Sequence, residues 1–149
     1  MKTGKNQLRS HCPVNFALEA VGDRWALLIL RDIVFRGQRT FGQFLKSGEG
    51  IATNILASRL EQLQEHGILK RSEDDTDARK ALYSLTPKGE DLIPMVFEMV
   101  LWSAKHDPKS EAAQIPGLVE LIRKDNRKIS RQVVSRVRRG EAIVESYLA

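Results

Sequence analysis

Apolar residues recur three and four positions apart along most of the chain, and this spacing predicts a mainly helical protein. A first helix is expected from Pro13 to just before Gly22, and a second from just after Asp23 to just before Gly37. The Asp23 carboxylate can accept hydrogen bonds from the free amides at the start of the second helix. Because that helix is apolar on most sides, we expect it to lie buried at the centre of the fold.

A short helix and a longer helix are predicted on either side of a turn that contains two glycines. The short helix is expected from Phe41 to about Lys46, and the longer one from about Thr53 to Glu65. Only a narrow stripe of the longer helix is apolar, and it consists of three leucines, Leu56, Leu60 and Leu63. This stripe can hold the helix to the body of the protein and leave the opposite face in solvent.

The pattern then changes to two short β-strands, which are predicted over residues 68–72 and 81–85. Residues 73–80 between them are too polar to be buried, so the strands are expected to form a solvated hairpin. A third major helix is predicted from Pro87 through Trp102 towards His106.

A final helical segment is expected after the boundary at Asp107-Pro108. It is predicted to begin at Pro116, to carry apolar residues at spacings near seven and four, and to be interrupted near Gly140. The predicted organisation is a flexible N-terminus (1–11), a central domain (12–107) and a helical C-terminal extension (108–149).

The length of 149 residues is that of one domain, and 24 Lys and Arg against 19 Asp and Glu leave a net charge of +5. Cys12 is the only cysteine, which excludes an internal disulfide framework and a multi-cysteine metal site. The apolar runs are too short to cross a membrane, and the N-terminus lacks a hydrophobic signal segment. A cytoplasmic protein with no membrane partner, metal or cofactor is therefore expected.

Two helices, a tight turn, a further helix and a polar hairpin follow one another in the order of a winged helix-turn-helix. The predicted fold class is mainly α with a small β-hairpin wing (α+β), extended by C-terminal helices for dimerisation. In this fold the second helix of the pair turns a polar face to the major groove of DNA. The residues that face outward at the start of this helix are Thr53, Asn54 and Ser58.

These three side chains suit the recognition of base edges. An asparagine can bond adenine through both amide groups, and the hydroxyl of a threonine or serine can serve either base type. The alternative is that they are merely solvated helix residues, with Thr53 capping the helix. Arg59 lies closer to the inward face, which favours a structural ion pair over base recognition.

Short motifs at characteristic spacings run along the first two-thirds of the chain. Those at the first two helices are Cys12-Pro13-Val14, Val21-Gly22-Asp23-Arg24-Trp25 and Leu28-Ile29-Leu30-Arg31-Asp32. Those that follow are Phe41 with Phe44, Leu56-Ala57-Ser58-Arg59-Leu60 with Leu63, Gly67-Ile68-Leu69, and Tyr83-Ser84-Leu85-Thr86-Pro87-Lys88-Gly89. Through these motifs, the chain from His11 to about Ala104 resembles the HxlR-type branch of winged-helix transcriptional regulators, which are relatives of the MarR group.

The resemblance implies a sequence-specific transcriptional regulator, not an enzyme, that binds a pseudo-palindromic double-stranded DNA operator as a homodimer. It places the helix from Thr53 in the major groove, and Arg79 and Lys80 at the wing near the minor groove or its phosphates. Family members often have serine or a similar cap where this chain has Ala52, so Thr53 is the residue that can take over capping here.

The wing carries an electrostatic argument of its own. Asp74, Asp75 and Asp77 repel phosphate, so the hairpin cannot be a broad basic grip. Asp77 stands two positions before Arg79 and can orient its guanidinium, leaving some of the donors for DNA. The alternative is a surface ion pair that contributes almost nothing, and the resemblance favours the DNA-binding interpretation.

Cys12 has two interpretations. It precedes Pro13 at a helix N-terminus, where the positive end of the helix dipole favours the thiolate, and His11 adjoins it. Several family members carry a cysteine here that senses electrophiles or oxidants, so the resemblance implies redox sensing and a small reactive effector. The alternative is a small, half-buried hydrophobic residue in a dimer interface.

The C-terminal extension is rich in basic residues, with eight Lys and Arg but only one acid between Arg123 and Arg139. Its apolar residues can pack a helix across the twofold axis of a dimer, and we favour this dimerisation role. The alternative is that basic residues on one side of the helix reach flanking DNA: Arg123, Lys124, Arg127, Lys128 and Arg131.

Two other classes of protein remain as alternatives. A small enzyme is disfavoured because His11, His66 and His106 are scattered without metal-ligand spacing, and the sequence contains no phosphate-binding loop. A winged-helix module that docks other proteins without binding DNA has the same fold. Strongly salt-dependent DNA binding distinguishes a regulator from both.

Overall fold

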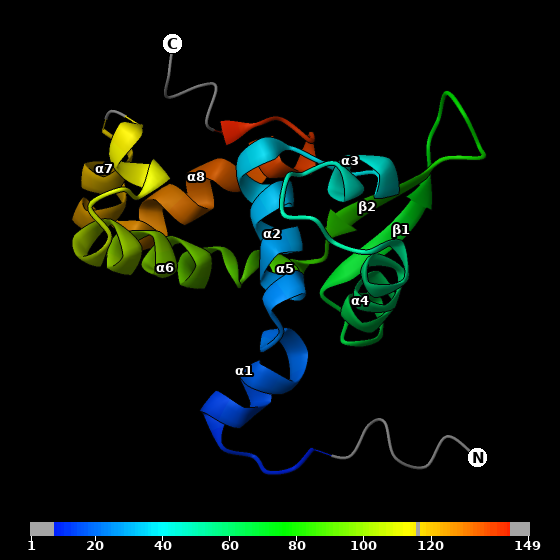
Figure 1. The fold of residues 1–149 in the computed structure, drawn as a ribbon, viewed down its shortest axis with the longest axis horizontal. Helices are drawn as coiled ribbons and strands as arrows, with labels where there is room; N and C mark the ends of the chain where they lie inside the picture. Colours follow the sequence, from blue (N-terminus) through cyan, green and yellow to red (C-terminus); the bar gives the residue numbers. More distant parts are fainter. Residues whose placement is uncertain (1–7, 116, 144–149) are drawn as a thin grey trace.

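The computed structural model describes residues 8–115 and 117–143, which form a mostly helical protein with one antiparallel β-hairpin (Figure 1). The elements of its first half are α1 (Pro13–Val21), α2 (Arg24–Arg36), α3 (Phe41–Leu45), α4 (Thr53–Glu65), β1 (Leu69–Glu73) and β2 (Ala81–Leu85). Those of its second half are α5 (Pro87–Glu90), α6 (Ile93–His106), the 3₁₀-helix η1 (Glu111–Gln114), α7 (Leu118–Lys124) and α8 (Asn126–Arg138). The predicted fold class is confirmed. Most of the predicted flexible N-terminus, residues 1–7, lies outside the described residues.

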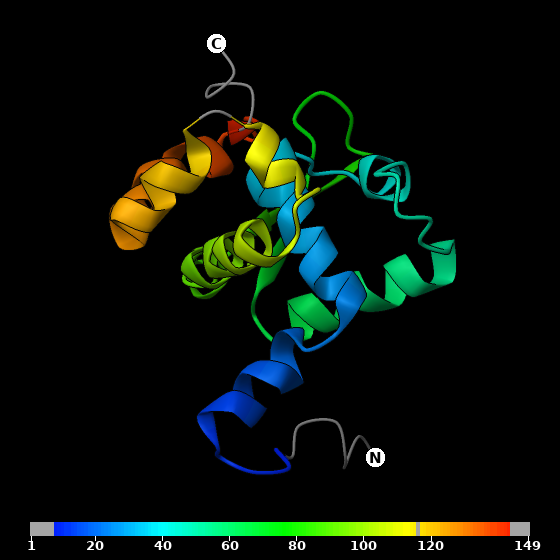
Figure 2. The same cartoon turned by 60° about the vertical axis from the view of Figure 1, so that its left-hand side comes forward.

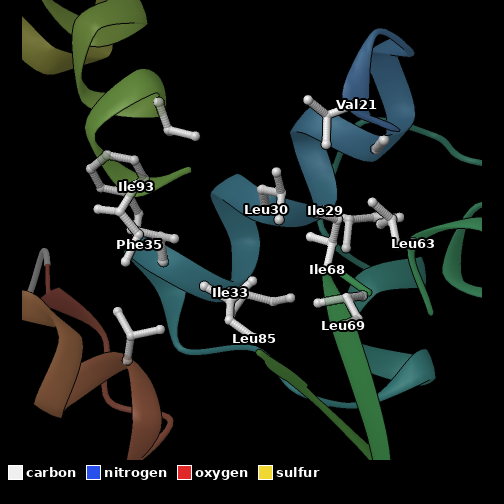
Figure 3. Packing of buried hydrophobic residues seen from close by; sticks show 14 of the residues in the cluster. Val21, Ile29, Leu30, Ile33, Phe35, Leu63, Ile68, Leu69, Leu85 and Ile93 are labelled. Atoms are coloured by element: carbon white, nitrogen blue, oxygen red, sulfur yellow. The ribbon is translucent and has the colours of Figure 1, made fainter. Parts of the chain in front are cut away.

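Helix α2 is the central element of the core, as its apolar sequence predicts. Its buried residues Ile29, Leu30 and Ile33 lie between α4 and α6. In Figure 3, Leu63 of α4 approaches them from one side and Ile93 of α6 from the other. The recognition part of the fold and the C-terminal half are therefore packed on the same helix.

Side-chain caps set the starts of α2 and α3. The Asp23 carboxylate accepts hydrogen bonds from the amides of Trp25 at 2.9 Å and Ala26 at 3.1 Å, as predicted. At α3, the Thr40 hydroxyl accepts from the Gln43 amide, and the Gln43 side chain accepts from the Thr40 amide. These reciprocal bonds stabilise a helix of only five residues.

The hairpin forms where it was predicted, with its first strand displaced by one residue. Leu69 of β1 pairs with Leu85 of β2, and both side chains are buried against the core. The strand starts at Leu69 because the Ile68 amide donates to the Leu63 carbonyl at 2.9 Å, closing the turn after α4. The amide of Ile68 is therefore unavailable to the strand ladder.

The predicted continuous helix from Pro87 to His106 is wrong, because the structure divides it into α5 and α6 at residues 91–92. The physical reason is Pro94, which has no amide hydrogen to donate to the Glu90 carbonyl and whose ring would clash with it. Pro94 instead lies in the first turn of α6, where no helical hydrogen bond is lost.

The single final helix is also wrong, since α7 and α8 are separate. Asp125 lies between them, and its carboxylate accepts a hydrogen bond from the Lys128 amide at 3.0 Å to begin α8. Pro116, the predicted start of this segment, lies outside the described residues.

The C-terminal extension packs on its own chain. Helices α7 and α8 cover α6, and α8 also touches α2, on the left of the molecule in Figure 1 and again in Figure 2. The buried apolar residues of the extension include Leu118, Ile122, Ile129, Val133, Val137 and Ile143. Burial within one chain accounts for these positions, and the dimerisation role of the extension stays a prediction.

Two glycine turns dock the end of α8 on the end of α2. Gly37 ends α2 with φ 65°, and Gly140 follows α8 with φ 69°. A Cβ at Gly37 would lie 2.5 Å from the Gly140 carbonyl oxygen and 2.8 Å from the Ala142 nitrogen. Only a glycine permits this close approach of backbones.

Gly37→Ala is therefore predicted to destabilise the protein more than Gly50→Ala. Both glycines have positive φ (65° and 74°), so each substitution costs about 1–2 kcal/mol of backbone strain. The space around Gly50 is open, whereas the clash at Gly37 adds about 1–3 kcal/mol. Chemical denaturation of the two variants measures the difference, and equal free energies of unfolding would contradict the docking.

Candidate nucleic-acid interface

Helix α4 has one buried face and one exposed face. Its buried side chains are the three predicted leucines, Leu56, Leu60 and Leu63. On the other face, Thr53 and Asn54 are exposed in the first turn, and Ser58 is half-buried one turn later. In Figure 1, α4 lies at the right-hand edge of the molecule. The structure thus brings the three candidate base-reading residues together on one accessible side.

The start of α4 differs from one expectation. Ala52 is the N-cap and makes no side-chain hydrogen bond, and Thr53 is already the first helical residue. The expectation that Thr53 takes over capping is therefore wrong. Among the described residues, the side chains of Thr53 and Asn54 make no hydrogen bond, so their polar groups are available to a ligand.

Arg59 links α4 to the start of α2. Its Nε donates to the Asp23 carboxylate at 2.8 Å, which confirms the predicted structural ion pair. Burial opposes ionisation of Asp23, but the hydrogen bonds from Arg59 and from the helix amides hold its pKa below the ordinary value. Arg59 also donates to the Ser58 hydroxyl at 3.4 Å. Arg59 therefore positions α4, and Ser58 is less free than Asn54.

A second ionic link, which sequence reasoning missed, holds the turn before α4. Arg31 donates to the Glu49 carboxylate at 2.7 Å and to the buried Asp32 carboxylate at 2.9 Å. Arg36 donates to the Ser47 carbonyl at 2.9 Å. Burial raises the pKa of Asp32, and the hydrogen bond from Arg31 lowers that of Glu49. The signal in the sequence was Glu49, an acid between the two glycines of the turn.

The wing holds an exposed arginine as predicted. Asp77 accepts hydrogen bonds from the backbone amide of Arg79 at 3.0 Å and from its Nε at 3.2 Å. The Arg79 side chain is 92% exposed, so its remaining nitrogens point into solvent. Lys80 is exposed beside it. A hydrogen bond from Thr76 lowers the pKa of Asp74, whose charge stays on the wing.

The wing and α4 lie on the same side of the molecule, to the right of α2 in Figure 1. Cys12 does not join them. It is a free, exposed thiol at the N-cap of α1, the helix that extends downward from the body in Figure 1. The candidate residues therefore form one potential DNA-binding surface and one separate thiol.

Other kinds of site find no support in residues 8–115 and 117–143. Within these ranges no three histidine, cysteine or acidic side chains converge on a position where a metal ion could be held. No helix within them has the length and apolar character needed to cross a membrane.

The class of protein is thus a winged helix-turn-helix with an exposed polar second helix. Residues 20–111 match the HxlR-like helix-turn-helix family, and the chain belongs to that family. It is 35% identical over 88 residues to the uncharacterised HTH-type transcriptional regulator sll1512 of Synechocystis, covering 59% of this chain. The match spans 64% of that relative, which is less than two-thirds of its length.

Solved structures resemble the same part of the chain. The crystal structure of PA1607 matches with a TM-score of 0.61 and 38% identity, covering 66% of this chain and 68% of PA1607. The redox regulator HypR in its oxidised form matches with a TM-score of 0.58 and 29% identity, covering 64% of this chain and 97% of HypR.

Proposed function

We propose that this protein is a cytoplasmic transcriptional regulator that binds a double-stranded DNA operator through α4 as a homodimer. The observation that carries the proposal is the polar first turn of α4, exposed opposite a buried leucine stripe. A helix of this kind fits the major groove, which is about 12 Å wide. Membership of the HxlR-like family and a relative named as a transcriptional regulator support it.

In this proposal the first turns of α4 read the operator. Asn54 bonds an adenine through its amide oxygen and nitrogen, and the Thr53 hydroxyl bonds a neighbouring base. Ser58 contributes less, since its hydroxyl is half-buried beside Arg59. The short side chains at the start of the helix let the backbone approach the groove closely.

The wing supplies contacts that position the protein without reading the sequence. Arg79, held by Asp77, and the adjacent Lys80 contact phosphates or the minor groove. The carboxylates on the same loop limit the wing to a few such contacts.

Exposed apolar side chains support the homodimer. On α1, Val14 is 65% exposed and Leu18 is 59% exposed, and on α6 Trp102 is 68% exposed. A second copy that covers these side chains removes apolar surface from water, which favours association. Two α4 helices related by a twofold axis then contact two half-sites, so the operator is pseudo-palindromic.

Cys12 is proposed as a redox-sensing residue of the regulator. Its thiol is exposed at the start of α1, the same helix that carries the exposed apolar side chains. In a homodimer built on α1, an adduct at Cys12 or a disulfide with the Cys12 of the second copy would alter the spacing of the two α4 helices. The match to HypR, a redox regulator solved in its oxidised form, supports this role.

Asn54→Ala is expected to relax base preference at one position in each half-site, at a cost of about 1–3 kcal/mol in binding. Selection of duplexes from a random library, followed by affinity measurements, identifies the position. Gln62→Ala removes an exposed amide from the same helix and serves as the matched control. If Asn54→Ala weakened binding to all sequences equally, Asn54 would be a phosphate contact and not a base reader.

Arg79→Ala is expected to lower operator affinity and to reduce the slope of log affinity against log salt by about one phosphate contact. Because the side chain is almost fully exposed, the thermal stability of the protein changes little. Lys109→Ala removes the same charge elsewhere and should leave the slope unchanged. An unaltered slope in Arg79→Ala would rule out the proposed wing contact.

Leu18→Asp is expected to convert the dimer into a monomer, because a charge in an apolar interface loses its hydration. Sedimentation equilibrium measures the mass of the variant and of the wild type. Leu121→Asp makes the same change at an exposed leucine of α7 and should preserve the dimer. A Leu18→Asp protein that stays dimeric would place the interface elsewhere.

Oxidation by diamide or alkylation by N-ethylmaleimide is expected to lower the operator affinity of the wild type but not that of Cys12→Ser. Gel-shift titrations before and after treatment measure the change, and a reductant should reverse the effect of diamide. The same response in both proteins would exclude Cys12 as the sensor.

A further inference from the structure

Helix α8 carries a basic face that the proposed function leaves unused. The helix contains five arginines and lysines and no aspartate or glutamate. Three of the five, Arg127, Lys128 and Arg131, are exposed and fall within about 100° of arc around the helix axis. We call these three residues the α8 basic face.

The charges of the α8 basic face are not neutralised within the described residues, where none of the three makes an ion pair. Other arginines near the same end of the chain differ in this respect. Arg138 donates two hydrogen bonds of 2.8 Å to Glu90, and Arg139 donates two to Glu141. The α8 basic face therefore presents three unpaired positive charges to solvent.

The packing of α8 fixes where these charges point. Its opposite side, with Ile129, Val133 and Val137, is buried against α6 and α2. In Figures 1 and 2, α2 lies between α8 and α4. Because the basic face points away from α2, it cannot reach the stretch of straight duplex that α4 would hold.

The side of the molecule that carries α4 is, by contrast, poor in free positive charge. Arg59 of α4 is engaged by Asp23, and the exposed Glu61 and Glu65 of the same helix repel phosphate. The wing combines Arg79 and Lys80 with its own carboxylates. Neutralisation of phosphates supplies much of the affinity of proteins for DNA, so the basic surface behind the fold is suited to the same ligand.

We propose that the α8 basic face binds the phosphate backbone of a second DNA segment, without sequence preference, while α4 holds the operator. The proposal rests on the DNA-binding function proposed above. Cationic side chains one helical turn apart, such as Arg127 and Arg131, can each meet a different phosphate. A homodimer carries two such faces and links two duplexes, or two distant parts of one.

The experiment is a bridging assay with the full-length chain. Operator DNA is immobilised and saturated with protein, and capture of a second, labelled duplex of unrelated sequence is measured at several salt concentrations. The wild type is expected to capture the second duplex. Arg127→Gln/Arg131→Gln should reduce capture about tenfold and lower its salt slope by about two, with operator affinity unchanged.

Two controls separate charge at this face from general effects. Arg127→Lys/Arg131→Lys keeps the charge and should keep the capture. Lys105→Gln/Lys109→Gln removes the same charge from the end of α6 and the segment after it, and should also keep the capture. Circular dichroism and thermal unfolding verify that all variants are folded.

Three outcomes overturn the proposal: equal capture by Arg127→Gln/Arg131→Gln and the wild type, equal losses in the two glutamine variants, or no capture by the wild type. In the last case an acidic protein surface becomes the better candidate for the occupant. If the protein binds no operator at all, the proposed function fails by itself. Direct titration of the unrelated duplex into the same variants then still tests the α8 basic face.

Discussion

Leu56, Leu60 and Leu63 attach α4 to the body through one narrow apolar stripe, and the rest of the interface depends on that attachment. Each buried leucine contributes about 1.5–3 kcal/mol relative to exposure, so the stripe is strong enough to hold a helix whose remaining surface is polar. Because the stripe is narrow, the opposite face stays in solvent. The same leucines that stabilise the fold thereby create the surface that we propose for DNA.

An apolar stripe does not by itself set how a helix is rotated or where it starts, and two ionic links supply this. Asp23 joins the start of α2 to Arg59 of α4, and Arg31 joins the middle of α2 to Glu49 in the preceding turn. Both links end on α2, the helix on which the C-terminal half also packs. Helix α2 is thus the common reference for α4, for α6 and for the basic helix α8.

The sequence predicted the features that are set by local chemistry. The Asp23 cap, the leucine stripe of α4 and the Arg79 wing pair each depend on residues a few positions apart, and each is present. The break before α6 was missed although its cause, Pro94, is local. The Arg31–Glu49 link and the burial of α8 on α6 were missed because they depend on contacts distant in sequence. Periodicity marks α8 as having an apolar side but does not identify what covers it.

Hydrogen exchange of the backbone amides, measured with and without operator DNA, tests the central claim most directly. If the first turns of α4 enter the groove, amides over residues 53–58 and 77–80 exchange more slowly in the complex. Slower exchange confined to other surfaces, with α4 and the wing unchanged at saturating operator, would contradict the account.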